Sequence, residues 1–159
     1  MYLTVEKVVR RRRELVWQVL TDVASLGAWV EGLAEAEILG NEDPDVDARL
    51  RVTRRGRADR EVHTCEITAW RPPEMLALEA HTERRSVFGR ITLEAVPEGT
   101  ALGVYVEIGK GGGLASFFKP AYGLMWAPSN EPPAAQAIYE RSVAALVARI
   151  EAHGERPFR

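Results

Sequence analysis

The C-terminal part of the sequence, from about residue 133 to residue 153, carries an apolar stripe with the spacing of an α-helix. Its apolar residues recur at steps of three and four positions and share one face: Ala135, Tyr139, Val143, Leu146 and Ile150. A helix of about 20 residues spans roughly 30 Å, and its apolar face must be covered by another element. The rest of the chain must therefore supply a broad apolar surface.

Seven upstream segments have the composition and alternation of β-strands. They are residues 2–9, 34–39, 48–57, 61–70, 75–82, 86–96 and 101–108. Their short connections indicate antiparallel hairpins. Two short helices are predicted after the first strand: one carries Val16, Val19 and Leu20, and the second covers residues 25–33 with Ser25 as its cap. The sequence therefore predicts an α+β fold with one long helix across one antiparallel sheet.

The alternation also assigns side chains to faces of the sheet. In residues 48–57, three arginines share one parity (Arg49, Arg51 and Arg55), and the opposite parity holds Leu50, Val52 and Arg54. In residues 61–70, one face is predicted to hold His63, Cys65, Ile67 and Ala69. The faces with more apolar side chains are the ones expected to cover the long helix.

The composition is that of an ordinary soluble globular protein, with 159 residues, 46% hydrophobic and 28% charged. This length predicts a single domain over residues 1–159. A net charge of −2 predicts no general attraction to nucleic acid. The single cysteine, Cys65, excludes an internal disulfide, and we find no apolar run long enough to cross a membrane. We therefore expect a cytoplasmic protein.

Three local patterns occur in the order found in a known superfamily. They are Glu14-Leu-Val-Trp17 followed by Asp22 and Trp29, then Thr68-Ala-Trp-Arg-Pro-Pro-Glu-Met-Leu76, then Leu93-Glu-Ala-Val-Pro-Glu-Gly-Thr-Ala-Leu102. With the order of elements, they resemble the START-like or Bet v 1-like (SRPBCC) superfamily, which includes bacterial polyketide cyclase/dehydrase-like and CoxG-like proteins. The resemblance implies a helix-grip fold, in which a curved sheet of about seven strands wraps around the C-terminal helix.

The resemblance also implies a cavity between the sheet and the helix for a small hydrophobic molecule of lipid, polyketide or aromatic type. Small alanine side chains on the helix would leave room for it. The predicted ligand-binding residues are Trp29, Arg54, His63, Cys65, Ile67, Tyr105, Phe117, Phe118, Tyr122 and Trp126. Arg54 and Tyr105 belong to this set only if they face inward. Ordinary core packing is the alternative for the apolar members.

The sequence offers no convincing catalytic set, so no catalytic residue, metal or cofactor is assigned. The three histidines, His63, His81 and His153, form no close pair. The glycines of residues 109–113 lack the spacing of a phosphate-binding loop, and Gly-x-Ser-x-Gly is absent. Cys65 is expected to be buried and unreactive in the middle of a strand.

Three functions remain open. The first is a carrier or sensor that binds a hydrophobic ligand without catalysis. The second is a cyclase or dehydratase acting on a polyketide-like substrate, with His63 as general base and Arg54 or Tyr105 stabilising an enolate. The third is a protein- or membrane-interaction module of CoxG or Hsp90-activator type, in which the aromatic residues 117–126 contact a surface or form a homodimer.

Overall fold

The computed structural model describes residues 2–41, 43–55, 61–81, 85–110 and 133–153. Within these ranges seven strands form one antiparallel sheet. The strands are β1 (Tyr2–Val9), β2 (Leu33–Ile38), β3 (Arg49–Arg54), β4 (Glu61–Arg71), β5 (Met75–His81), β6 (Arg85–Val96) and β7 (Gly99–Lys110). The helices are α1 (Arg13–Leu20), the 3₁₀ helices η1 (Val23–Ala28) and η2 (Leu39–Asn41), and α2 (Pro133–Ala152).

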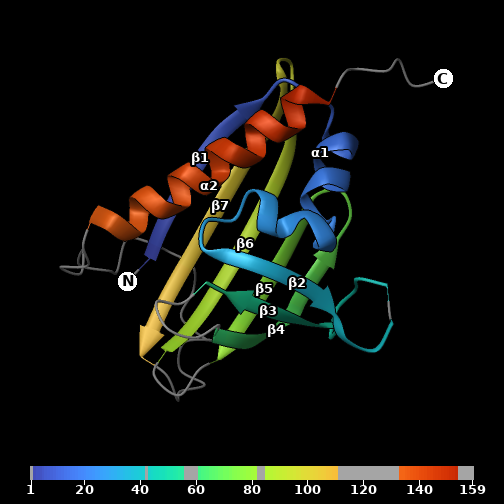
Figure 1. Cartoon of the computed structure of the whole chain (residues 1–159). Coiled ribbons are helices and arrows are strands. Elements are labelled where there is room, and N and C mark those ends of the chain that lie inside the picture. Colours follow the sequence, from blue (N-terminus) through green and yellow to red (C-terminus); the bar gives the residue numbers. More distant parts are fainter. Residues whose placement is uncertain (1, 42, 56–60, 82–84, 111–132, 154–159) are drawn as a thin grey trace.

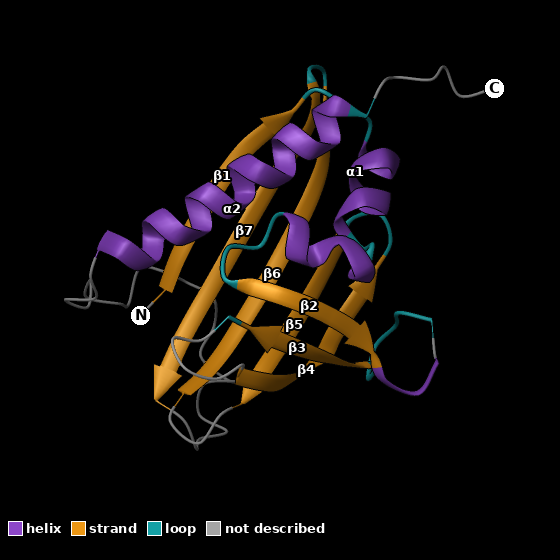
Figure 2. Ribbon diagram, viewed as in Figure 1, coloured by secondary structure: helices purple, strands orange, loops and turns teal. Residues whose placement is uncertain are grey.

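The strand order is β1-β7-β6-β5-β4-β3-β2. Strands β2 to β7 therefore pair with their neighbours in sequence, while β1 pairs with β7, from Tyr2 opposite Glu107 to Val9 opposite Thr100. The sheet is curved, and α2 crosses one side of it in front of β1 and β7 (Figure 1). Helices α1 and η1 lie on this same side (Figure 2), which we call the concave side. This arrangement is the predicted helix-grip fold.

The main core fills one end of the space between α2 and the sheet. Its buried members are Val5, Val9, Val16, Trp17, Val19, Leu20, Leu76, Leu93, Leu102, Val143, Leu146 and Ile150. Along α2, Leu146 and Ile150 are fully buried, whereas Ala135 and Tyr139 are only half-buried. The predicted helical stripe is thus confirmed, but its first half is packed less completely than its second half.

A tight turn at Glu98 and Gly99 joins β6 to β7. Gly99 has a φ of 144°, a conformation that residues with a side chain rarely adopt. A Cβ atom at Gly99 would also collide with the carbonyl oxygen of Val9. The close approach of this turn to the end of β1 therefore requires glycine.

Two local predictions are wrong. Residues 25–33 form no Ser25-capped helix, because the Ser25 hydroxyl donates to the carbonyl of Asp22 at 2.9 Å and only the 3₁₀ helix η1 forms. Ala69 does not share a face with Ile67, because a β-bulge between these residues shifts the register. The bulge instead turns Trp70 inward, where its ring packs edge-on against Trp17 at 4.9 Å. The aromatic residues 117–126 lie outside the described residues.

Candidate ligand-binding site

The concave side carries half-buried apolar side chains near the middle of the sheet. They border the main core without being covered by it: Trp29, Trp70, Leu78, Ile91, Val104 and Tyr139. They come from η1 and its following loop, β4, β5, β6, β7 and α2. Large apolar residues gain most from full burial, so incomplete cover at the centre of a domain indicates a place where another molecule can pack.

Gly89 on β6 lies at the centre of this surface. The register places it opposite Leu78 on one side and Val106 on the other, so a side chain here would point to the concave side. No described atom lies within 4 Å of a Cβ atom built at Gly89. Because protein interiors are normally close-packed, the open position marks a space that the described residues leave unfilled. We call this the concave space.

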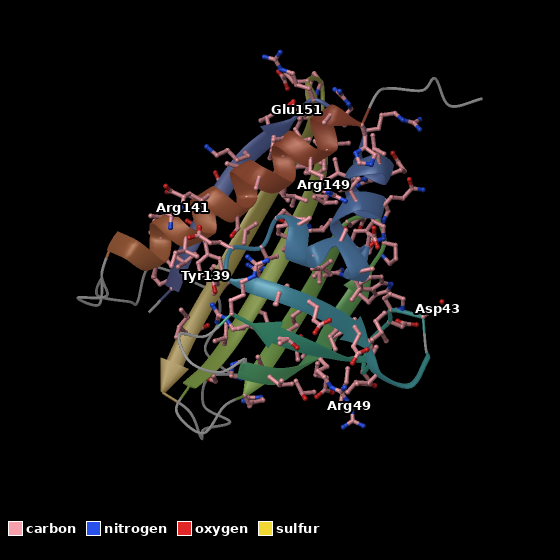
Figure 3. The ribbon with its side chains drawn as sticks, in the orientation of Figure 1. Asp43, Arg49, Tyr139, Arg141, Arg149 and Glu151 are labelled. Carbon is pink, nitrogen blue, oxygen red and sulfur yellow. The ribbon has the colours of Figure 1, made fainter. Side chains whose placement is uncertain are left out.

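Three polar side chains from different elements meet at one border of the concave space. Arg54 ends β3, Cys65 lies on β4, and Tyr139 projects from α2 toward the strands (Figure 3). Burial raises the pKa of the Cys65 thiol, and the positive charge of Arg54 opposes that shift. Burial likewise raises the pKa of Tyr139, again opposed by Arg54. The guanidinium therefore lies close enough to act on both groups.

The remaining predicted residues on β4 and near η1 have different surroundings. His63 lies opposite Val52, two positions from Cys65, and is half-buried on the concave side. Ile67 is only 2% exposed and belongs to a second core cluster with Ala48 and Leu50, so it offers little surface to a ligand. Trp29 packs its ring against the main core. Its buried indole N–H has no hydrogen-bond partner among the described residues.

Tyr105 lies on the opposite, outer face of the sheet, since β7 directs Val104 and Val106 to the concave side. Its hydroxyl donates to Glu107 Oε2 at 3.4 Å, its ring lies 6.0 Å from that of Tyr2, and the Arg90 guanidinium stands 5.3 Å from the ring centre. Burial and Glu107 raise the pKa of Tyr105. Tyr105 therefore cannot act together with His63, and we remove it from the candidate site.

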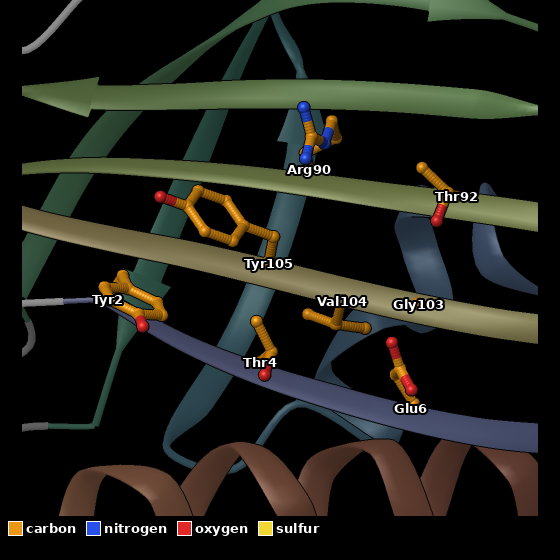
Figure 4. Close-up of a pocket in the computed structure, with 8 residues that line it drawn as sticks. All are labelled: Tyr2, Thr4, Glu6, Arg90, Thr92, Gly103, Val104 and Tyr105. Carbon is orange, nitrogen blue, oxygen red and sulfur yellow. The ribbon is translucent and has the colours of Figure 1, made fainter. Parts of the chain in front are cut away.

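Tyr105 instead borders a shallow hollow of about 260 Å³ on the outer face (Figure 4). The residues that line it are Tyr2, Thr4, Glu6, Arg90, Thr92, Gly103, Val104 and Tyr105. At Gly103 there is no room for a side chain, because a Cβ atom there would approach the Thr92 hydroxyl oxygen to 2.8 Å. This lining is polar and wide open, unlike the apolar surface around Gly89, so the concave space is the stronger candidate for a hydrophobic ligand.

The other predicted aromatic residues, Phe117, Phe118, Tyr122 and Trp126, lie outside the described residues. Across the described ranges, no three His, Cys, Asp or Glu side chains gather in a way that could hold a metal ion. None of the described helices has the length and apolar character needed to cross a membrane.

Sequence reasoning missed Gly89, Leu78 and Ile91 as lining residues. Gly89 carried a usable signal, since a glycine inside a strand often marks a place where something must approach the backbone closely. Leu78 and Ile91 looked like any other inward strand position. Only the three-dimensional packing shows that they stay half-buried.

Several solved structures are similar to this one over nearly the whole chain. A protein of Mesorhizobium loti matches with a TM-score of 0.69 at 17% identity, covering 97% of this chain and 99% of its own. Ara h 8.0201 matches with a TM-score of 0.69 at 11% identity, covering 96% and 99%. A protein of Thermus thermophilus matches with a TM-score of 0.68 at 12% identity, covering 98% and 100%. At these identities the likeness establishes the Bet v 1-like fold and nothing further.

Comparison with curated proteins found no match. A comparison with protein families found one described as "Polyketide cyclase / dehydrase and lipid transport", which matches residues 2–151. This match spans every described strand, the concave space and nearly all of α2. The predicted superfamily is thereby confirmed: the chain belongs to the polyketide cyclase/dehydrase and lipid transport family.

Proposed function

We propose that the protein binds a small hydrophobic molecule in the concave space, as a carrier or sensor. The observation that carries the proposal is the ring of half-buried apolar side chains around Gly89, where no described atom fills the position of a side chain. The family description, which includes lipid transport, supports the same ligand class.

Energetics favour an occupied space over an empty one. Ligand pockets begin at about 300 Å³, and an unfilled apolar cavity of that size costs on the order of 7 kcal/mol at about 24 cal/mol per Å³. That cost is comparable with the whole net stability of a domain. An apolar space of that size should therefore be hydrated or occupied by a ligand, and a ligand that covers Leu78, Ile91 and Val104 would gain their burial.

The test is native mass spectrometry of the purified protein, followed by extraction and identification of any bound molecule. We expect a stoichiometric hydrophobic molecule in the wild type and none in Gly89→Leu, because the new side chain would extend into the space from a Cβ position that no described atom approaches within 4 Å. Glu94→Leu is the matched control, because it adds the same side chain at an exposed position of the same strand.

Gly89→Leu tests where the ligand binds, whereas the wild-type protein tests whether a hydrophobic ligand is bound at all. A Gly89→Leu protein that folds and still carries its ligand would show that the ligand binds elsewhere. A wild-type protein that carries nothing, and that binds nothing from a panel of lipids, polyketides and aromatics, would refute the proposed function.

A further inference from the structure

Arg54 stands at the rim of the concave space rather than in its interior. It shares the inward parity of Leu50 and Val52 on β3, yet its side chain is exposed. Its Nη2 atom lies 3.9 Å from the position a Cβ atom would take at Gly32, in the exposed loop before β2. The guanidinium therefore sits between this loop and the half-buried Tyr139 of α2, with one side open to solvent.

The charge environment of Arg54 differs from that of Arg51 and Arg141. Arg51 pairs with Glu37 at 2.9 Å, and Arg141 pairs with Glu31 at 2.8 Å. Among the side chains that the structure describes, none forms an ion pair with Arg54. The polar groups on which its charge acts are the Cys65 thiol and the Tyr139 phenol, both of which burial keeps neutral. A cation thus borders an apolar space and has no acidic partner among the described side chains.

This arrangement discriminates between ligands by their polar end. A ligand with a neutral end would displace water from the guanidinium without replacing its hydrogen bonds fully. A carboxylate or phosphate would instead form charge-assisted, bidentate hydrogen bonds with the guanidinium. Because Arg54 lies at the exposed rim, the bound pair would stay in contact with water, so its desolvation cost would be small.

Resting on the proposed function, we propose that the ligand is an amphipathic acid: its apolar chain fills the concave space around Gly89, and its anionic group binds Arg54 at the rim. In this arrangement the Tyr139 hydroxyl of α2, on which the charge of Arg54 acts, donates a second hydrogen bond to the same anion.

The test compares dodecanoate with dodecanol, which has the same chain length and no charge, by titration calorimetry on protein freed of co-purified molecules. We expect the wild type to bind dodecanoate about tenfold more tightly than dodecanol, as one charge-assisted contact would give. Arg54→Gln should lose this preference and keep its affinity for dodecanol. Arg51→Gln, a change on the outer side of the same strand, should retain the preference.

Acetate distinguishes an amphipathic ligand from a free anion. We expect millimolar acetate, which has the charge but no chain, not to displace dodecanoate. Displacement by acetate would mean that Arg54 holds a small anion only, and would overturn the inference.

The outcomes also separate this inference from the proposed function. Equal affinity of the wild type for the two amphiphiles, or an unchanged preference in Arg54→Gln, overturns the role of Arg54 and leaves hydrophobic binding intact. Unaltered dodecanol binding in Arg54→Gln serves as proof that the variant is folded. A wild-type protein that binds neither molecule refutes the proposed function together with the inference.

Discussion

Glu79 is a carboxylate buried on the outer face of the sheet. Its side chain is 6% exposed, and its closest described ionic partner is His81 Nε2 at 3.2 Å. Burial raises the pKa of Glu79, the nearby Glu66 raises it further, and His81 opposes both. Because the folded-state pKa is raised, the folded protein bears a cost whenever this carboxylate is charged.

We therefore expect Glu79→Gln to stabilise the protein at pH 7, by no more than about 1 kcal/mol because this face lies close to solvent. The gain should shrink as the pH falls through the raised pKa toward the ordinary value of 4.5, since protonation then removes the same cost from the wild type. Urea denaturation of both proteins at pH 7 and near pH 4 measures this.

Glu94→Gln is the control for this prediction, because Glu94 is exposed on the neighbouring strand β6. It should leave the midpoint of denaturation nearly unchanged at both pH values. A Glu79→Gln protein less stable than the wild type at pH 7 would mean that the contact with His81 outweighs the cost of burial.

At the scale of elements, α2 is attached to the rest of the molecule by polar contacts along its length. Gln136 donates to the carbonyl of Thr4 on β1 at 3.0 Å, and Arg11 donates to the carbonyls of Glu151 and His153 at the helix end. In the middle, the buried Ser142 hydroxyl accepts the backbone N–H of Glu31 at 2.9 Å. This last contact holds the loop that borders Arg54.

We expect Ser142→Ala to lower the free energy of unfolding by about 1–2 kcal/mol, because the backbone N–H of Glu31 loses its described acceptor. Arg141→Gln removes the neighbouring exposed ion pair with the Glu31 side chain and should have a smaller effect. Chemical denaturation measures the free energy of unfolding of both variants. A larger loss in Arg141→Gln than in Ser142→Ala would contradict this prediction.

Most elements could be predicted from local patterns, because each strand or helix follows from alternation or from a stripe of apolar residues. The parity argument also placed Arg54, His63 and Cys65 on the inward faces of β3 and β4. It failed at Ala69, where one extra residue in a bulge reverses the faces that follow. It also failed at Ser25, whose hydroxyl bonds locally instead of capping a helix.

At the scale of the whole molecule, packing is uneven. The core is dense where α1 and the second half of α2 meet the sheet, and the concave space lies beside the first half of α2. No sequence pattern could have located this division, because Leu76 and Leu78 are the same residue type on the same face and differ only in what covers them. The position of a cavity is a property of the assembled layers.

A ligand in this space should stabilise the entire fold by mass action. At a free concentration of about 100 times Kd the gain is about 2.7 kcal/mol, which for a chain of this size raises Tm by roughly 5–10 °C. Differential scanning calorimetry with dodecanoate measures the shift. Gly89→Leu should show no such shift, and an equal shift in that variant would place the stabilising site elsewhere.

The pairing of β1 with β7 has a consequence for how the protein is made. On the ribosome, β2 to β7 can join hairpin by hairpin as they emerge, whereas Tyr2 must wait for Glu107. At about 5–20 residues per second this wait lasts roughly 5–20 seconds. Throughout it, the apolar side of β1, with Leu3, Val5 and Val9, has no sheet to join. Among the seven strands of this sheet, β1 is synthesised first and has to wait for β7, so the newborn chain offers chaperones the apolar side of β1.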